Sequence, residues 1–144
     1  MFTNFLHGLN LQLGYTAPQN EDCEVRGNVV IGGDLTLHKF KSVVNEGNLV
    51  VARDQPRPRG VRVILRPNKY DSARAHLAIY NFQGSPAVDV DASGFLKPGD
   101  TFRLMNPREF YGKPLLTGTF EARPIPVPMN GEFAVFVLLK EPGR

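Results

Sequence analysis

The chain has 144 residues, of which 42% are hydrophobic and 22% are charged, and it contains 14 glycines and 12 prolines. That length is typical of one globular domain, and so many turn-forming residues favour short strands over a helical bundle. The formal net charge is +3, but the segment 53–69 carries six cations against one acid, so the remaining residues sum to −2. A single basic segment is a poor nucleic-acid surface, and we expect no nucleic-acid partner.

Cysteine content and the start of the chain exclude further classes. Cys23 is the one cysteine of the sequence, which excludes an internal disulfide and a multi-cysteine zinc site, and we expect it to pack as a small hydrophobe. The start lacks a basic n-region, and no stretch approaches the roughly 20 apolar residues of a membrane helix. We therefore expect no membrane partner. The compartment stays open: it is extracellular or periplasmic if the chain is part of a longer exported protein.

The first residues of the chain fit two patterns. Apolar side chains at positions 2, 5, 6 and 9 would line one face of a helix, whereas Leu9, Leu11 and Leu13 alternate as in a strand. Gly14 ends the second pattern, and the residues that follow it have β character. We therefore expect a strand from about Leu9.

A short motif recurs in residues 1–52. GNVVI at 27–31 returns as GNLVV at 47–51, and GGDLTL at 32–37 offers a strand between the two copies. A period near 20 is typical of the coils of a solenoid, although a simple meander with recurring Gly-Asn turns gives the same pattern. We predict a β-coil or meander segment over 1–52.

A proline-rich stretch separates this segment from the rest of the chain. Pro56, Pro58 and Gly60 interrupt 53–60, which we interpret as a stiff, extended connector. Past it, apolar and polar residues alternate through about seven short strands, with turns at roughly 8–12-residue intervals, which is typical of an antiparallel β-sandwich. The predicted fold is all-β: a coil or meander segment at 1–52, a connector at 53–60 and a β-sandwich at 61–144.

Three features of the sandwich region give finer predictions. PIPVP at 124–128 predicts an edge strand, because proline cannot donate to a central ladder. Asn130-Gly131 predicts a two-residue hairpin turn. The following EFAVFVLL at 132–139 is apolar on both faces, so we expect a central strand there.

Several motifs within 27–139 resemble a known family. VDVDASGFLKPGD at 88–100 and NPREFYGKP at 106–114, followed by PIPVPM and a last apolar strand, are similar to the C-terminal β-sandwich of bacterial right-handed parallel β-helix proteins of the pectin-lyase-like type. The resemblance implies that GNVVI and GNLVV belong to the last coils of a β-helix, and it implies a carbohydrate setting. In that family the catalytic groove lies on the coils, with acidic calcium ligands and a basic proton abstractor. No position here matches them, so no catalytic residue is carried over.

The basic segment is the strongest candidate for a binding site. Arg57 and Arg59 flank a proline, and Arg62 and Arg66 leave the following strand on one side, about 13 Å apart by strand rise. Arginine binds carboxylate and sulfate in a bidentate manner. Tyr80 falls on the same face of the neighbouring strand, where it would stack on a sugar ring. We predict that these five residues bind an acidic polysaccharide. Alternatively, the arginines pair with acidic groups of the preceding coils or keep the junction soluble.

The remaining chemistry-bearing residues form no recognisable motif. His7, His38 and His76 lack close metal-ligand spacing, so we expect no metal and no cofactor. Asp89 and Asp91 lie two apart on one predicted strand, where they form a solvated face, a calcium site or an acid–base pair. No catalytic residue is assigned.

These observations together predict a non-catalytic accessory or capping module of a carbohydrate-active β-helix protein, in contact with acidic glycans. Such a module would self-associate, or pack on a β-helix domain, through an apolar end of the 1–52 segment. Two alternatives stay open. One is a stand-alone acidic-polysaccharide-binding module, and the other is the remnant of a polysaccharide lyase or glycoside hydrolase.

Overall fold

The computed structural model describes residues 5–14 and 20–141, and these residues form an all-β protein, which confirms the predicted fold class. The chain divides into two compact units, residues 1–58 and 59–144, and each is described by itself. The division falls inside the segment 53–60. Position 2, part of the alternative helical pattern, lies outside the described residues.

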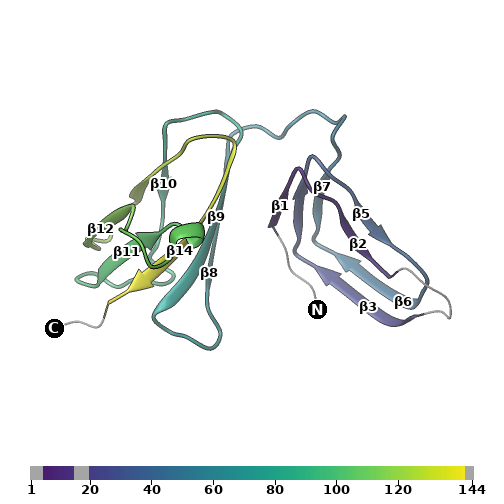
Figure 1. Cartoon of the computed structure of the whole chain (residues 1–144), viewed down its shortest axis with the longest axis horizontal. Coiled ribbons are helices and arrows are strands. Elements are labelled where there is room, and N and C mark those ends of the chain that lie inside the picture. Colours follow the sequence, from purple (N-terminus) through teal and green to yellow (C-terminus); the bar gives the residue numbers. More distant parts are fainter. Residues whose placement is uncertain (1–4, 15–19, 142–144) are drawn as a thin grey trace. The chain divides into compact units, whose positions relative to one another are not determined.

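The N-terminal unit is built from seven short strands. They are β1 (Phe5–His7), β2 (Leu11–Leu13), β3 (Asn20–Arg26), β4 (Val29–Ile31), β5 (Leu35–Leu37), β6 (Phe40–Glu46) and β7 (Leu49–Val51). They form three parallel sheets, with the orders β1-β4-β7, β2-β5 and β3-β6. Figure 1 shows these strands in purple to teal, side by side within each sheet. The chain visits the three sheets in a fixed order and then returns to the first; we call each such circuit a pass.

Strand spacing explains the recurrence of the Gly-Asn motif. Val29 of the middle pass pairs with Leu49 of the last pass, and it also pairs with Phe5 of the first pass. The sequence separation of partners is 20 between the middle and last passes and 24 between the first and middle passes. The difference lies in the connection between β2 and β3, which is longer than the connection between β5 and β6.

Parallel pairing also decides between the two interpretations of the motif. A meander would pair successive strands antiparallel, so the meander interpretation is wrong for these strands. Leu9, the predicted start of the first strand, lies between β1 and β2. The described strands of the N-terminal unit are therefore stacked coils.

Burial differs between the middle and the last pass. Cys23 is 3% exposed and Val25 is 0% exposed, so this face of β3 points inward, and the prediction that Cys23 packs as a hydrophobe is confirmed. Val43 pairs with Cys23 on the next strand but is 46% exposed. Val50 is likewise 37% exposed, although Val30, on which it stacks, is 0% exposed. The last pass leaves apolar side chains uncovered.

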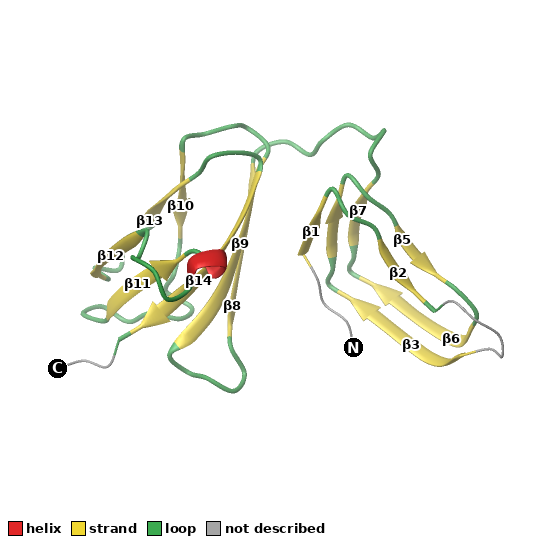
Figure 2. Ribbon diagram, viewed as in Figure 1, coloured by secondary structure: helices red, strands yellow, loops and turns green. Residues whose placement is uncertain are grey.

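The C-terminal unit contains the predicted seven strands of 61–140. They are β8 (Val61–Pro67), β9 (Arg74–Asn81), β10 (Ala87–Val90), β11 (Thr101–Met105), β12 (Leu116–Thr119), β13 (Ile125–Pro128) and β14 (Phe133–Lys140), with one 3₁₀ turn, η1 (Pro107–Glu109). Five of them form an antiparallel sheet in the order β12-β11-β14-β9-β8, and β10 pairs antiparallel with β13 in a second sheet. Figure 2 shows η1 as the red element among yellow strands.

One apolar core joins the two sheets of this unit. The two-stranded sheet contributes Val88, Val90, Ile125 and Val127, and the five-stranded sheet contributes Leu77, Ile79, Phe102, Leu104, Phe136 and Leu138. These side chains alternate with outward-facing ones along each strand, as the period of a β-strand requires. Two sheets packed face to face over a shared core are a β-sandwich.

The two remaining strand predictions are confirmed. β13, which carries Pro126 and Pro128, pairs with β10 alone and is therefore an edge strand. β14 is the central strand of the five-stranded sheet. Val137 and Leu138 are both buried although they point to opposite faces, so both sides of β14 are covered.

The predicted hairpin at Asn130-Gly131 is wrong. β13 and β14, which flank it, lie in different sheets and do not pair with each other. The segment carries the chain from one sheet to the other, and Asn81 donates its backbone N–H to the carbonyl oxygen of Glu132 (2.7 Å) where β14 begins beside β9. A two-residue turn signal reports local backbone preference and does not specify which sheet the next strand joins.

Candidate functional site

The predicted arginines are divided between the two units. Arg57 belongs to the N-terminal unit, while Arg59, Arg62 and Arg66 belong to the C-terminal unit. The Arg57 guanidinium lies against the turn after β4, with Nη2 2.9 Å from the place where a Cβ on Gly32 would stand. All four arginines are exposed. The structure thus places Arg62 and Arg66 on one strand of the C-terminal unit, whereas Arg57 belongs to the other unit.

Arg62 and Arg66 lie on β8, an edge strand of the five-stranded sheet. Arg62 is directly opposite Tyr80 on β9, and Arg66 is directly opposite His76. Residues directly opposite each other share one face of a sheet. The prediction that Arg62, Arg66 and Tyr80 occupy one face is therefore correct.

Tyr80 is nevertheless buried, which contradicts its predicted role as a platform for a sugar ring. Its exposed fraction is 0%, and its ring centroid lies 4.7 Å from that of Phe133 and 5.8 Å from that of Phe82. Burial raises the pKa of Tyr80 well above its ordinary value, and the nearby Arg62 offsets part of that rise. Tyr80 packs the outer face of the sheet and is not available to a ligand at the surface.

The buried phenol gives an expected pH dependence of stability. Because the folded-state pKa of Tyr80 is raised, the neutral phenol stabilises the fold fully below the ordinary pKa of about 10, and this contribution is lost as pH rises above it. We expect the free energy of unfolding, measured by urea denaturation, to fall more between pH 9 and pH 11 for the wild-type protein than for Tyr80→Phe, by about 1 kcal/mol. Parallel falls in the two proteins would show that the phenol ionises freely in the folded state.

The predicted acidic pair is divided between a strand and a turn. Asp89 is exposed on β10, opposite Pro126, whereas β10 ends at Val90 and Asp91 lies beyond it. The Asp91 Oδ1 accepts a hydrogen bond from the Ser93 backbone N–H (2.9 Å), and hydrogen bonds from the Ser93 side chain and backbone lower the pKa of Asp91. Asp91 therefore shapes the turn after β10.

Metal-ligating side chains are not grouped in the described part of the chain. Within residues 5–14 and 20–141, no group of three or more histidine, cysteine, aspartate or glutamate side chains is arranged to hold a metal ion. His76 has a polar neighbour of another kind, since its Nε2 lies 3.2 Å from the Asn68 side-chain nitrogen. The histidines thus supply no starting point for metal chemistry.

A hollow of about 490 Å³ lies beside η1 on the C-terminal unit. Among its lining residues Arg108 is charged, and most of the others are apolar or proline. General acid–base catalysis requires a titratable acid and base within reach of a substrate. The hollow brings no such pair together.

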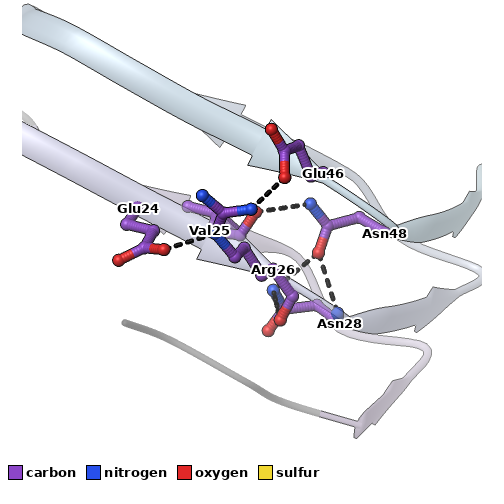
Figure 3. Close-up of polar contacts among 6 residues, drawn as sticks. All are labelled: Glu24, Val25, Arg26, Asn28, Glu46 and Asn48. Atoms are coloured by element: carbon purple, nitrogen blue, oxygen red, sulfur yellow. Dashed lines mark hydrogen bonds and ion pairs between the residues drawn. The ribbon is translucent and has the colours of Figure 1, made fainter.

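Stacked polar side chains in the N-terminal unit are a feature that the sequence analysis missed. Asn48 Oδ1 accepts hydrogen bonds from the backbone N–H (2.8 Å) and the side-chain Nδ2 (2.7 Å) of Asn28, which is 0% exposed. Asn48 Nδ2 donates to the Val25 carbonyl oxygen (2.9 Å) and to Asn45 Oδ1 (2.6 Å). Figure 3 shows Asn28, Asn48 and Val25 where adjacent passes meet. Both asparagines stand in the Gly-Asn motifs, so the motif marks a hydrogen-bonded stack as well as a turn.

Charged side chains repeat the spacing of the asparagines. Arg26 pairs with Glu46 as well as with Glu24, and these carboxylates raise the pKa of Arg26, with the hydrogen bond that Arg26 donates to Glu24 contributing most. Lys41 pairs with Glu21. Pairs of this kind at the surface contribute little to stability, but they fix which residues of two parallel strands face each other.

Two exposed tyrosines also stand outside the sequence-based site. Tyr70 is 89% exposed in the turn between β8 and β9, and Tyr111 is 99% exposed after η1. The signal for Tyr70 was an aromatic residue inside the otherwise polar turn PNKYDS, because a turn tip seldom buries its side chains. Tyr70 follows directly from the strand that carries Arg62 and Arg66.

Comparisons with protein-family models, with curated proteins and with solved structures gave no match. In the part of the chain that the structure describes, no helix has the length and apolarity to cross a membrane. The class of the protein therefore follows from its structure. It is an all-β protein in which a unit of stacked parallel strands is followed along the chain by an antiparallel sandwich with a basic edge strand.

Proposed function

We propose that this protein is a non-catalytic end module of a β-helix protein from a carbohydrate-active setting. In this proposal residues 5–51 are passes of a parallel β-helix, and the C-terminal sandwich is an accessory domain that follows them. The regular stacking of parallel strands from one pass to the next supports the β-helix interpretation. The carbohydrate setting is supported by the resemblance of 27–139 to pectin-lyase-like proteins.

The single observation that carries the proposal is the open last pass. Val43 occupies an inward position on β6 and is 46% exposed, whereas its partner Cys23, one pass earlier, is 3% exposed. β6 and β7 are the last strands of their sheets among the described residues, so the backbone of each has one ladder edge without a strand. Such an edge is completed by another strand of the same kind. This end would therefore accept a β-coil from another chain, because the strands that follow β7 in this chain belong to other sheets.

Self-association tests this proposal, because a second copy of the chain would cover the open end in the absence of other coils. We expect sedimentation to show concentration-dependent dimers of the wild-type chain, and Val43→Lys to stay monomeric because a lysine there prevents stacking. Val61→Lys is the matched control, since Val61 is an exposed valine on the edge strand β8 of the other unit. A wild-type chain that stays monomeric at every concentration, or dimers that survive Val43→Lys, would contradict the proposal.

A second candidate function is contact with an acidic polysaccharide. Its support is the exposure of Arg62 and Arg66 on one face of β8, because a guanidinium binds carboxylate or sulfate in a bidentate manner. The burial of Tyr80 removes the aromatic partner that the sequence suggested for this face. A polysaccharide site on this face therefore needs an exposed aromatic side chain other than Tyr80.

A further inference from the structure

We propose that the turn joining β8 to β9 is a binding site for a sugar ring that carries a carboxylate or sulfate group. The site consists of Tyr70 as a stacking platform, Lys69 and Arg66 as anion contacts, and His76 as a hydrogen-bonding neighbour. This inference rests on the second candidate function and names its site and ligand class.

Tyr70 offers an accessible aromatic surface. It is 89% exposed, whereas Tyr80, on the sheet behind it, is 0% exposed. An aromatic ring binds the apolar face of a sugar by burying carbon-bound hydrogens against it, and a tyrosine brings a large contact area with few rotatable bonds. Tyr70 supplies the platform that the arginine face lacks.

Side-chain and backbone hydrogen bonds hold this turn in one conformation. Asn68 Oδ1 accepts from the backbone N–H groups of Tyr70 (2.8 Å) and Asp71 (3.1 Å), and Asp71 Oδ1 accepts from that of Ala73 (3.0 Å). The backbone N–H of Asn68 donates to the carbonyl oxygen of Arg74 (2.8 Å) and closes the turn. A ligand that stacks on Tyr70 therefore does not have to order the loop first.

One cationic group lies beside the Tyr70 ring. The Lys69 Nζ is 5.4 Å from the ring centroid, so an acidic group on a stacked sugar would lie within reach of the ammonium. Between residues 66 and 76, three lysine or arginine residues stand against one aspartate, a formal net charge of +2. Arg74 pairs with Asp71 (3.3 Å) and lies 5.4 Å from the centroid of the Phe110 ring, so it is not one of the anion contacts.

The Asn68 side chain also orients His76. Because Asn68 Oδ1 accepts two backbone N–H groups, its Nδ2 is the group that faces His76 Nε2 at 3.2 Å. Nδ2 is a donor, so His76 Nε2 accepts and the ring carries its hydrogen on Nδ1. His76 is directly opposite Arg66, and both side chains are exposed. A hydrogen-bond donor and a guanidinium thus stand together on one face beside the turn.

Binding of oligogalacturonate to the whole chain, measured by calorimetry at low salt, tests the site. We expect Tyr70→Ala to weaken binding about three- to tenfold, Tyr70→Phe to leave it nearly unchanged, and Arg66→Ala or Lys69→Ala to weaken it about tenfold. Arg123→Ala is the matched charge control, because Arg123 is an exposed arginine between β12 and β13. It should bind like the wild type. Added salt should weaken every interaction that depends on these charges.

A polyanion without sugar rings separates stacking from simple charge attraction. Inorganic polyphosphate should bind more weakly than oligogalacturonate, and Tyr70→Ala should not affect it. Equal binding of polyphosphate, or full oligogalacturonate binding by Tyr70→Ala, would overturn the site; in the latter case dependence on Arg62 and Arg66 would keep the second candidate function. Absence of oligogalacturonate binding would overturn both the Tyr70 site and the second candidate function. The end-module proposal would still be tested separately by sedimentation.

Discussion

Gly33→Ala is expected to unfold the N-terminal unit selectively. A Cβ at position 33 would stand 2.1 Å from the carbonyl oxygen of Leu9 and 2.6 Å from its carbonyl carbon. Both atoms belong to the backbone of the neighbouring pass, so no side chain can rotate away to make room. Nearby hydrogen bonds from Leu11 N to Asp34 O (2.8 Å) and from Asp34 N to Asn10 Oδ1 (2.9 Å) fix the separation of the two passes.

We expect Gly33→Ala to lower the free energy of unfolding of the N-terminal unit by about 3 kcal/mol or more, which is at the upper end of the destabilisation that overpacking causes. The measurement is the rate at which Cys23 reacts with a thiol reagent. Cys23 is the one cysteine in the sequence and is 3% exposed in the N-terminal unit, so its reaction reports the opening of that unit. A destabilisation of this size should accelerate the reaction about a hundredfold when opening is a rapid equilibrium.

Gly94→Ala is the matched control for Gly33→Ala. A Cβ on Gly94 would meet no atom within 4 Å, and the residue lies in the other unit. Its effect should stay within about 0.5 kcal/mol, with Cys23 reacting at the wild-type rate. Wild-type reactivity in Gly33→Ala would mean that positions 9 and 33 do not approach each other as described.

The second large effect is expected for Asn48→Ala. Asn48 accepts two hydrogen bonds from the fully buried Asn28 and donates to the Val25 carbonyl oxygen. Alanine at this position removes the acceptor of the Asn28 backbone N–H and the donor to the Val25 carbonyl oxygen, while Asn28 Nδ2 keeps its hydrogen bond to the Arg26 carbonyl oxygen (3.3 Å). A buried polar group without a hydrogen-bond partner destabilises the folded state, and we expect the free energy of unfolding to fall by about 2–4 kcal/mol. The rate at which Cys23 reacts with a thiol reagent again measures this destabilisation.

Two companion variants define which hydrogen bonds matter. Asn48→Asp keeps an acceptor for Asn28 but places a carboxylate oxygen against the Val25 carbonyl oxygen, so it should destabilise nearly as much as alanine. Asn45→Ala removes one hydrogen bond at an exposed position and should cost about 1 kcal/mol or less. If Asn45→Ala and Asn48→Ala were equally mild, the buried asparagine stack would not stabilise the passes.

The sequence predicted the strands of the sandwich well, because the patterns that mark them involve residues that are neighbours in the chain. Alternation of apolar and polar residues predicted the strands whose core includes Phe102 and Leu104, and prolines at 126 and 128 marked an edge strand. The same alternation correctly assigned Arg62 and Tyr80 to one face. It could not show that this face is covered at Tyr80, because burial on the outer side of a sheet depends on which side chains pack there, here the nearby Phe82 and the sequence-distant Phe133.

The N-terminal passes were only partly predictable. The recurrence of Gly-Asn was visible in the sequence, but the first pass is separated from the middle one by a longer interval and therefore did not align with it. Two copies could not decide between parallel and antiparallel pairing, since both begin with the same turn residues. The buried partner of Asn28 was not predictable either, because it lies one pass further along the chain.

The position of β14 has a consequence for the order in which the protein matures. Phe133–Lys140 comes last among the described strands, yet it sits between β9 and β11 and supplies the contacts that join them. During synthesis, which proceeds from the N-terminus, residues 61–128 must wait on or near the ribosome with two ladder edges and much of the core unpaired. The stacked passes need only residues before 52, so the first unit can mature while the second is still being made.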